Sequence, residues 1–364
     1  MASSNPAVVV TGVAGNLGTR LLSQLADFQV IGVDLNPPNT GQPLRFVQMD
    51  LGQEESCRQL YLLLRESRAV GVVHLAYVLD PVRTGVLDLD RMWHINVAGT
   101  ARVMEAITEA NRDEVIVQKF IFPSSVAAYG PDLPGLVTEE TPLAAHTLPY
   151  ALHKMEADQV VQQRAPSLRG CSAFLLRPHI VAGASVQNYI LGAFRGTPNG
   201  KGGRAAKMRR RGQRLPCLLP YGRAYLERRL QFVHVDDMSR LMAYILRRTE
   251  PEAQRLTIMN VTGRGEPVTF QQCIEMSHNK LRRVPSKALF RGILRLLWNL
   301  KICAIPPEAV PYMTGEYLMN TDKLQRFLGK DYEKVIRYTI ADAFADSFSS
   351  QHPTPAMSSS AKVE

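Results

Sequence analysis

The first half of the chain alternates short, continuous apolar runs with segments of helical periodicity. Strands that are buried on both faces form such uninterrupted apolar runs, and helices between them supply the crossover connections that parallel strands need. The predicted strands are 7–11, 30–33, 45–49, 70–75, 120–122 and 173–176. The predicted helices between them are 16–27, 54–66, 88–110 and 150–164. This alternation predicts an α/β fold with a doubly wound parallel sheet.

The alternation of apolar runs and helical segments becomes less regular in the second half of the chain. This change predicts a division of the chain into a main domain and a smaller lobe. We expect the main domain over 1–183 and a C-terminal substrate lobe over 184–346, with 231–248 returning to the main domain. The last segment, 347–364, is rich in Ser, Pro and Ala and is predicted to be a disordered tail. The remaining predicted elements are a strand over 231–235 and helices over 237–248, 269–279 and 287–301.

The composition indicates a globular protein without a membrane span. No run of 18 apolar residues is free of charge, and the short polar N-terminus lacks the basic and apolar regions of a signal peptide. The 5 cysteines are scattered without a CxxC pair, which argues against a disulfide scaffold or a zinc site and fits a reducing compartment. We therefore expect a cytoplasmic protein that holds no metal.

The net charge of +10 is confined to one segment. Between Arg195 and Arg229 the chain carries eleven Lys and Arg and one acid, Glu227. A nucleic-acid-binding protein usually spreads cations over a face, with aromatic residues or a recognition helix among them. We therefore expect no nucleic-acid partner. The segment 195–229 could contact a substrate diphosphate, but the favoured interpretation is a solvated, mobile insertion.

Three glycines connect the first predicted strand to the first predicted helix. In Thr11-Gly-Val-Ala-Gly-Asn-Leu-Gly18, Gly12 permits a sharp turn, Gly15 allows the backbone to approach a pyrophosphate, and Gly18 allows the helix to pack on the sheet. The helix N-terminus then presents free N–H groups to phosphates. This arrangement predicts a Rossmann-type dinucleotide site.

An acid ends the second predicted strand and selects between the two nicotinamide cofactors. Asp34 can accept hydrogen bonds from the ribose hydroxyls and repels a 2′-phosphate, and neither Leu35 nor Asn36 supplies a cation for that phosphate. We therefore expect NAD rather than NADP. Asp50, followed by Leu51, ends the third strand, where it either meets the adenine edge or caps the next helix.

Tyr150 and Lys154 are four residues apart on a predicted helix and therefore share one face. A phenol is a poor base at neutral pH, and a neighbouring ammonium favours the phenolate. Ser124 and Ser125 follow a predicted strand, at the sheet edge where ligands bind in such folds. A serine hydroxyl there can polarise a substrate oxygen or bond to Tyr150.

Taken together, these motifs resemble those of the extended short-chain dehydrogenases/reductases, of the NAD-dependent epimerase/dehydratase type that includes UDP-glucose 4-epimerase-like enzymes. The matching pieces are 11–18, Asp34, Asp50-Leu51, His74-Leu-Ala76, Asn96-Val-Ala-Gly-Thr100, Ser124–Gly130, Tyr150 with Lys154, Arg177-Pro178 and Phe232–Asp237. The resemblance implies catalytic roles for Ser125, Tyr150 and Lys154. It implies that NAD is bound by Gly12, Gly15, Asn16, Leu17, Gly18, Asp34, Asp50, Leu51, Leu75, Ala76, Asn96, Tyr150 and Lys154. It also implies a homodimer.

The reaction stays open between two hydride transfers. The acids or cysteine that related dehydratases, decarboxylases and epimerase-reductases carry after the catalytic hydroxyl are replaced by Val126 and Ala127, which transfer no proton. One interpretation is an epimerase-like enzyme acting on a nucleotide sugar. The alternative is a dehydrogenase or reductase of a steroid-like or other apolar alcohol, and a second alternative is a non-catalytic NAD-binding protein.

The substrate half carries mixed signals. Asn188 resembles the asparagine that approaches a nucleotide diphosphate, and Arg229 lies beside the position of a family arginine, so both are predicted to contact substrate together with Ser125 and Tyr150. In contrast, Ile180 and Leu230 stand where sugar-nucleotide epimerases carry Asn and Arg.

The amphipathic segment 286–301 carries a predicted apolar stripe flanked by cations. The stripe comprises Leu289, Phe290, Ile293, Leu296, Leu297 and Leu300. Such a helix can lie on an anionic membrane, but the favoured interpretation is a helix packed over the lobe.

Overall fold

The computed structural model describes residues 5–42, 44–79, 88–131, 133, 135–249, 255–316 and 318–349. The strands of its central sheet are β1 (Ala7–Thr11), β2 (Gln29–Asp34), β3 (Arg45–Gln48), β4 (Gly71–His74), β5 (Lys119–Pro123), β7 (Ser172–Pro178) and β12 (Leu256–Val261). The seven strands are ordered β12-β7-β5-β4-β1-β2-β3, and every neighbouring pair is parallel. The predicted doubly wound parallel sheet is therefore confirmed.

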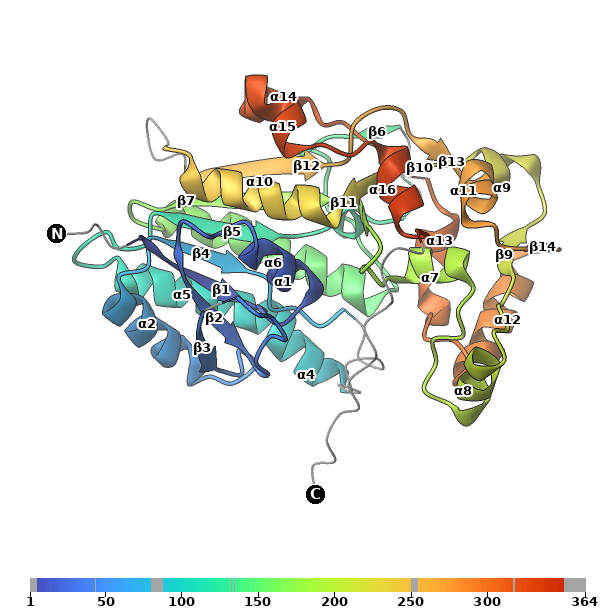
Figure 1. Cartoon of the computed structure of the whole chain (residues 1–364), viewed down its shortest axis with the longest axis horizontal. Helices are drawn as coiled ribbons and strands as arrows, with labels where there is room; N and C mark the ends of the chain where they lie inside the picture. Colours follow the sequence, from blue (N-terminus) through green and yellow to red (C-terminus); the bar gives the residue numbers. More distant parts are fainter. Residues whose placement is uncertain are drawn as a thin grey trace.

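Helices cover both faces of this sheet (Figure 1). One face packs against α2 (Ser56–Ser67), α5 (Gly99–Ala110) and α6 (Pro149–Arg164). The other packs against α1 (Asn16–Leu22), α10 (Val235–Arg247), α14 (Asp322–Leu328) and α15 (Tyr332–Val335). Because both faces are covered, successive residues of β1 are all buried, which explains the continuous apolar run in the sequence.

The first six predicted strands lie within two residues of the observed ones, but the edge strand β12 was missed. Polar Thr257 and Asn260 interrupt its apolar run, and its partner β7 lies about 80 residues earlier. The strand predicted over 231–235 is the shorter β11 (Phe232–His234). It pairs with β8 (Ile180–Ala182) outside the central sheet.

The helix predicted over 88–110 consists of three consecutive segments. α4 (Leu89–Trp93) leads into the π-helical turn η1 (His94–Ala98), which leads into α5. A π turn widens the helix locally and often occurs at functional sites. Here it carries Asn96 inward, with its side chain completely buried.

A lobe of short paired strands and helices lies beside the carboxyl ends of the sheet strands (Figure 1, right). Its strand pairs join β9 (Cys217–Pro220) to β14 (Leu281–Val284) and β10 (Arg229–Leu230) to β13 (Val268–Thr269). Its helices are α7 (Tyr189–Arg195), α8 (Gly203–Arg210), α9 (Arg223–Glu227), α11 (Phe270–Ser277), α12 (Lys287–Asn299), α13 (Val310–Thr314) and α16 (Ile340–Asp346). A further pair joins β6 (Leu136–Val137) to β15 (Leu318–Met319).

The segment between β8 and β12 leaves the main domain and returns to it. α10 packs on α1, and its Met238 and Leu241 share a core with Val8 and Val10 of β1. No helix among the described residues is long and apolar enough to cross a membrane.

The basic segment 195–229 is not an unstructured insertion. It contains α8, β9 and α9, and Arg209 donates to the carbonyl oxygens of Pro198 and Gly200. Arginine side chains that bond backbone carbonyls fix the segment's own path, so the interpretation as a mobile insertion was wrong.

Two other expectations need correction. In α12 only Phe290 and Leu294 are buried, whereas Leu289 and Leu296, both assigned to the packed stripe, are exposed. At the predicted tail, Ser347 is buried and its hydroxyl accepts a hydrogen bond from the backbone of Gly183 at 2.9 Å. Residues 350–364 of that tail lie outside the described residues.

Candidate active site

The glycine loop after β1 is packed too closely for side chains at two of its three glycines. Gly12 has φ +70°, and a Cβ there would lie 2.4 Å from the backbone nitrogen of Ala76. A Cβ on Gly18 would lie 2.5 Å from the carbonyl oxygen of Gly12. The loop thus lies against the chain that follows β4, at the point between β1 and β4 where the strand order reverses. Open α/β sheets bind their ligands at this point.

Asp34 ties the end of β2 to this loop. Its Oδ2 accepts a hydrogen bond from the backbone nitrogen of Ala14 at 3.0 Å, and its Oδ1 accepts from Leu35 at 2.7 Å. No ion pair involves Asp34 within the described part of the chain. The carboxylate is half-buried and uncompensated, which suits the hydroxyl-accepting role that the sequence predicts.

Asp50 does not cap a helix, because the residue before α2 is Glu55. Its Oδ1 instead accepts from the backbone nitrogen of Gly52 at 2.9 Å, and its Oδ2 lies 3.4 Å from Arg91. Leu51 is buried beside it. The helix-cap alternative is therefore wrong, and the adenine-edge role stays a prediction.

His74 ends β4 as a buried, structural residue. Its Nδ1 lies 2.7 Å from the Thr11 hydroxyl and its Nε2 lies 3.1 Å from the Thr100 hydroxyl. Burial, with the nearby Lys154 ammonium, lowers the pKa of His74 to about 3, so the ring is neutral. The backbone nitrogen of Leu75 donates to the carbonyl oxygen of Thr11 at 3.0 Å. This hydrogen bond keeps the chain after β4 next to the glycine loop.

The predicted catalytic trio comes together at the carboxyl edge of the sheet. Tyr150 is the second residue of α6, and Lys154 follows one turn later, where its ammonium donates to the Pro123 carbonyl at 2.7 Å. Burial raises the pKa of Tyr150, and a hydrogen bond with Ser125 lowers it. The Ser125 hydroxyl also accepts from the backbone nitrogen of Ala127 at 3.1 Å.

Lys154 lies in buried surroundings that disfavour its charge. Burial lowers its pKa to about 7, and Asp158 partly opposes this effect. The ammonium faces aromatic rings, with its nitrogen 3.6 Å from the centre of the Tyr77 ring and 5.0 Å from that of Phe122. A buried group whose pKa is shifted toward neutral pH is typical of an active site.

Tyr77 is a site residue that the sequence did not predict. Its ring meets that of Tyr150 edge to face, with centroids 6.0 Å apart. Its hydroxyl and that of Ser124 are buried without a hydrogen-bond partner among the described residues. Buried polar groups are rarely left unpaired, so these two hydroxyls indicate a ligand that supplies partners.

Asn96 holds the chain beyond Tyr77 in place. Its Oδ1 accepts from the Val78 nitrogen at 2.7 Å, its Nδ2 donates to the Val78 carbonyl at 3.0 Å, and His153 lies 3.5 Å away. The side chain therefore acts on the backbone that carries Tyr77. Its predicted contact with a cofactor is not tested by this geometry.

Asn16 and the two predicted substrate residues have protein partners. Asn16 donates to the Ser185 carbonyl at 3.0 Å. The Asn188 amide caps α7, accepting from Leu191 and donating to Val181. Arg229 is exposed and pairs with Glu316 at 3.3 Å.

A buried arginine fixes the segment between Ser125 and Tyr150. Arg177 forms two hydrogen bonds with the Asp158 carboxylate, at 2.8 and 2.9 Å, and donates to the Tyr129 hydroxyl at 2.8 Å. The Tyr129 hydroxyl in turn donates to Asn260 of β12 at 2.8 Å. Because Asp158 and Lys154 are one turn apart on α6, this network also orients the helix that carries Tyr150 and Lys154.

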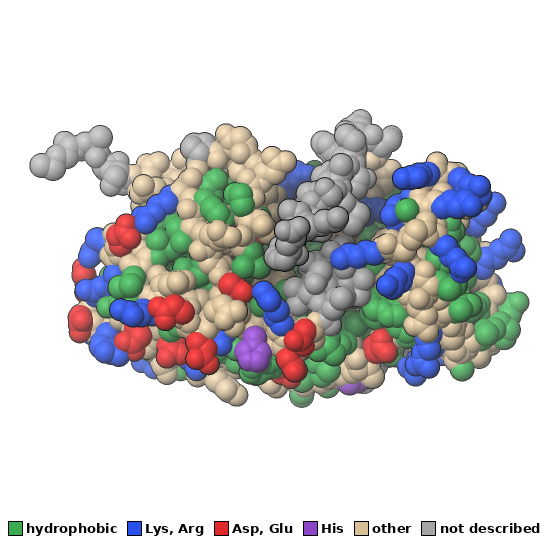
Figure 2. Space-filling view, turned by 90° about the horizontal axis from the view of Figure 1, so that it is seen from below, with side chains coloured by type: hydrophobic (Ala, Val, Ile, Leu, Met, Phe, Trp, Pro, Cys, Tyr) green, Lys and Arg blue, Asp and Glu red, His purple; other side chains and the backbone are tan. Residues whose placement is uncertain are grey.

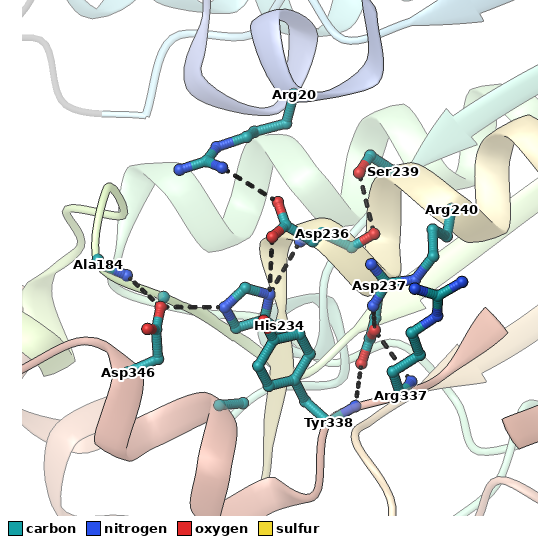
Figure 3. Close-up of polar contacts among 12 residues, drawn as sticks. Arg20, Ala184, His234, Asp236, Asp237, Ser239, Arg240, Arg337, Tyr338 and Asp346 are labelled. Carbon is teal, nitrogen blue, oxygen red and sulfur yellow. Dashed lines mark hydrogen bonds and ion pairs between the residues drawn. The ribbon is translucent and has the colours of Figure 1, made fainter. Parts of the chain in front are cut away.

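A second polar cluster joins the main domain to the lobe and contains His234 (Figure 3). The ring lies between two carboxylates, with Nε2 3.1 Å from Asp346 and Nδ1 accepting from the Asp236 backbone at 3.1 Å. It stacks on Tyr338 with centroids 3.7 Å apart. Asp236 also pairs with Arg20 of α1 at 3.4 Å. Each of these contacts joins His234 to another side chain or to the backbone of the chain, which favours a structural role for the ring.

Within the described ranges, no group of three or more His, Cys, Asp and Glu side chains is arranged to hold a metal ion.

The glycine loop at the switch point of the sheet defines a Rossmann-type protein, and the Tyr–Lys pair lies at the carboxyl edge of that sheet. The sequence profile of the NAD dependent epimerase/dehydratase family matches residues 8–261, and the chain belongs to this family.

Two curated relatives carry the name UDP-glucose 4-epimerase. The protein from Drosophila melanogaster is 27% identical over 214 residues, which cover 53% of this chain and 58% of the relative. The protein from Azospirillum brasilense is 27% identical over 188 residues, which cover 50% and 51%. The chain thus matches about half the length of these relatives.

Solved structures of the same fold cover nearly the whole chain. UDP-glucose 4-epimerase from Thermotoga maritima, solved with UDP-glucose, has a TM-score of 0.65 at 17% identity and covers 94% of this chain and 97% of its own. The Thermus thermophilus enzyme of the same name, solved with NAD, has a TM-score of 0.64 at 20% identity, covering 94% and 98%. dTDP-glucose 4,6-dehydratase from Bacillus anthracis has a TM-score of 0.64 at 16% identity, covering 94% and 95%. At these identities the likeness concerns the fold alone.

Proposed function

We propose that the chain is an NAD-dependent enzyme that transfers a hydride at a secondary hydroxyl, with Tyr150 carrying the proton. The observation that supports this most directly is the convergence of Ser125, Tyr150 and Lys154 at the carboxyl edge of the sheet. A non-catalytic NAD-binding protein has no physical need of all three groups at that edge.

The cofactor fits the residues that surround this edge. The cradle at Gly12 and Gly18 excludes side chains, Asp34 offers a carboxylate, and Ser124 and Tyr77 offer unpaired hydroxyls. The residues proposed to hold NAD are Gly12, Gly15, Asn16, Leu17, Gly18, Asp34, Asp50, Leu51, Leu75, Ala76, Asn96, Tyr150 and Lys154. When bound, NAD supplies the hydride acceptor and donor.

The chain's own part in the chemistry is to move one proton. Tyr150 is half-buried, and desolvation raises its pKa, so the phenol is the resting form and is ready to protonate a developing alkoxide. In the opposite direction it receives the proton of a substrate hydroxyl. Ser125, hydrogen-bonded to Tyr150, is placed to orient the substrate oxygen between them. Lys154 stabilises the phenolate whenever that form is present.

The flanking residues favour epimerisation over dehydration. Val126 and Ala127 lie buried in the 3-10 turn η2 (Val126–Tyr129), at the positions where related dehydratases carry acids, and neither can transfer a proton. Together with the names of the relatives, this supports a 4-epimerase-like reaction on a nucleotide sugar. Asn188 and Arg229 are the proposed contacts to the diphosphate of this sugar. To bind it, Asn188 would have to release the Val181 carbonyl, and Arg229 would have to release Glu316.

One observation favours the second candidate, oxidation or reduction of an apolar alcohol. Tyr150 packs against an apolar cluster to which α12 and α13 contribute Phe290, Leu294, Val310 and Tyr312. In addition, Ile180 and Leu230 are buried and offer no polar group to a sugar. A substrate held by such surfaces would gain from apolar burial.

The accumulation of NADH separates the candidates. The protein should be incubated with NAD and UDP-glucose or UDP-galactose, and separately with sterol and other lipid alcohols. An epimerase returns the hydride before product leaves, so sugar interconversion without growth of NADH absorbance is expected. Stoichiometric NADH with a non-nucleotide alcohol would instead establish the second candidate, and no turnover of any kind would favour a non-catalytic protein.

A further inference from the structure

The positive charge of the chain is gathered in two segments of the lobe. Residues 195–229 and 280–301 hold eighteen of the 43 Lys and Arg but one of the 33 acidic residues, so the rest of the chain is net negative. The two segments lie side by side, because β9 of the first pairs with β14 of the second and the Gly202 nitrogen donates to the Lys301 carbonyl. Figure 2 shows the result, with Lys and Arg side chains crowding the lobe at the right and acidic ones mainly at the left and centre.

Helix α12 adds apolar side chains to this basic surface. Its buried side, with Phe290 and Leu294, packs into the apolar cluster around Tyr150. Leu289 and Leu296 are two turns apart on another side, where they are 46% and 58% exposed. A large apolar side chain left in water beside its buried neighbours is unusual when it recurs along one edge of a helix.

The remaining side of α12 is a row of cations along an open groove. Lys287, Arg291 and Arg295 line it on one side, and Val310 and Pro311 of α13 line it on the other. Neither Arg291 nor Arg295 forms an ion pair within the described part of the chain. Their charges are therefore available to an anionic partner.

We propose that this face of the lobe, formed by α12 with the basic surface around α8, docks on an anionic membrane surface. Lipid headgroups would meet the unpaired cations, and Leu289 and Leu296 would enter the interfacial region. Charge alone would suit any polyanion, but only a membrane also removes the two leucines from water. The proposal does not depend on the reaction, although it would place the packed side of α12, and with it the cluster around Tyr150, close to the bilayer.

Vesicle co-sedimentation of the full chain tests the charge requirement. Phosphatidylcholine vesicles containing phosphatidylglycerol should bind the protein, pure phosphatidylcholine vesicles should not, and added salt should weaken binding. Arg291→Gln/Arg295→Gln should reduce binding roughly 30-fold, from about fivefold per cation near the surface. The matched control is Arg58→Gln/Arg65→Gln, which removes two exposed arginines from α2 in the main domain and should leave binding unchanged.

A second pair of variants tests the leucines. Leu289→Gln/Leu296→Gln should weaken vesicle binding several-fold while its salt dependence stays, whereas Leu62→Gln, at a leucine of α2 that is 52% exposed, should have no effect. Equal binding to neutral vesicles, equal losses in the control variants, or no vesicle binding by the parent chain would each overturn the proposal. So would a shift from dimer to monomer in light scattering caused by the leucine variant, or binding to single-stranded RNA in place of vesicles, because each outcome identifies a different occupant of this face.

Discussion

The ammonium nitrogen of Lys154 lies 3.6 Å from the centre of the Tyr77 ring, between this ring and the Pro123 carbonyl that accepts its hydrogen bond. An ammonium has three N–H groups. One N–H donates to the Pro123 carbonyl and another faces the Tyr77 ring. A single N–H therefore stays available to donate to a ribose hydroxyl or a phenolate. Tyr77 therefore both buries the charge of Lys154 and restricts the direction in which it can act.

The unpaired hydroxyl of Tyr77 predicts a gain in stability when it is removed. Tyr77→Phe keeps the ring over Lys154 and deletes a buried hydroxyl without a partner among the described residues, so the free energy of unfolding should rise by about 1 kcal/mol. Tyr129→Phe is the matched control, because that hydroxyl bonds to both Arg177 and Asn260. Its loss should lower the free energy of unfolding by about 1–3 kcal/mol. Urea denaturation of both variants measures this, and equal changes would show that Tyr77 has a partner.

The lowered pKa of Lys154 predicts a pH-dependent cost to stability. The pKa falls from 10.5 to about 7 on folding. Below pH 7 Lys154 is charged in both the folded and the unfolded state. The full free-energy cost of burying this charge then lowers the stability of the fold. Between pH 7 and 10.5 the unfolded state binds a proton that the folded state lacks, so the contribution of Lys154 to the free energy of unfolding rises with pH.

Lys154→Met removes this dependence. The difference in the free energy of unfolding between the variant and the parent chain should be about 2–3 kcal/mol more favourable to the variant at pH 6 than at pH 9. Urea denaturation at the two pH values measures this difference. Lys207→Met, at an exposed lysine of α8, controls for the loss of an ammonium. A constant difference between Lys154→Met and the parent chain across this range would mean that Lys154 stays charged when buried.

Asp34 predicts a preference for NAD over NADP. A carboxylate close to a 2′-phosphate repels it by about 2 kcal/mol even at a solvated edge, which corresponds to roughly 30-fold in affinity. Isothermal calorimetry with both cofactors measures the ratio. Asp34→Asn should narrow it, since the amide keeps an oxygen for the Ala14 nitrogen while losing the charge. Equal affinities of the parent chain for the two cofactors would contradict the assignment of Asp34.

Tyr150→Phe should abolish turnover while NAD still binds. The substitution removes the hydroxyl proposed to exchange the proton and keeps the ring that packs against Tyr77. A loss of at least about 100-fold in kcat is expected for the removal of a general acid/base. Turnover near the parent rate on any accepted substrate would transfer the role to another group.

The sequence was informative wherever a structural requirement is local. The turn at Gly12, the close packing at Gly18 and the one-turn spacing of Tyr150 and Lys154 all depend on residues that are near each other in the chain. Their positions could therefore be predicted from spacing and residue type alone.

The missed features depend on distant partners. Tyr77 is an aromatic residue after an apolar strand, and nothing local indicates that its ring covers Lys154, 77 residues later. Periodicity assigns an apolar stripe to α12, but the width of the facing surface decides that Phe290 is buried and Leu289 is not. Strand β12 pairs with β7, which lies much earlier in the chain. Its polar Asn260 accepts a hydrogen bond from the Tyr129 hydroxyl, so this position does not follow the apolar pattern of a buried strand.

The position of β12 beside β7 has a consequence for synthesis on the ribosome. About 80 residues separate the two strands, so at 5–20 residues per second the outer edge of β7 emerges roughly 4–16 seconds before its neighbour exists. During that interval β7, a strand of 7 residues that are all buried in the folded protein, presents unpaired backbone N–H and C=O groups along one edge. Such an edge can pair with another nascent chain. Slower translation between β7 and β12 would lengthen this exposure and lower the yield of soluble protein, whereas slower translation after residue 261 would not.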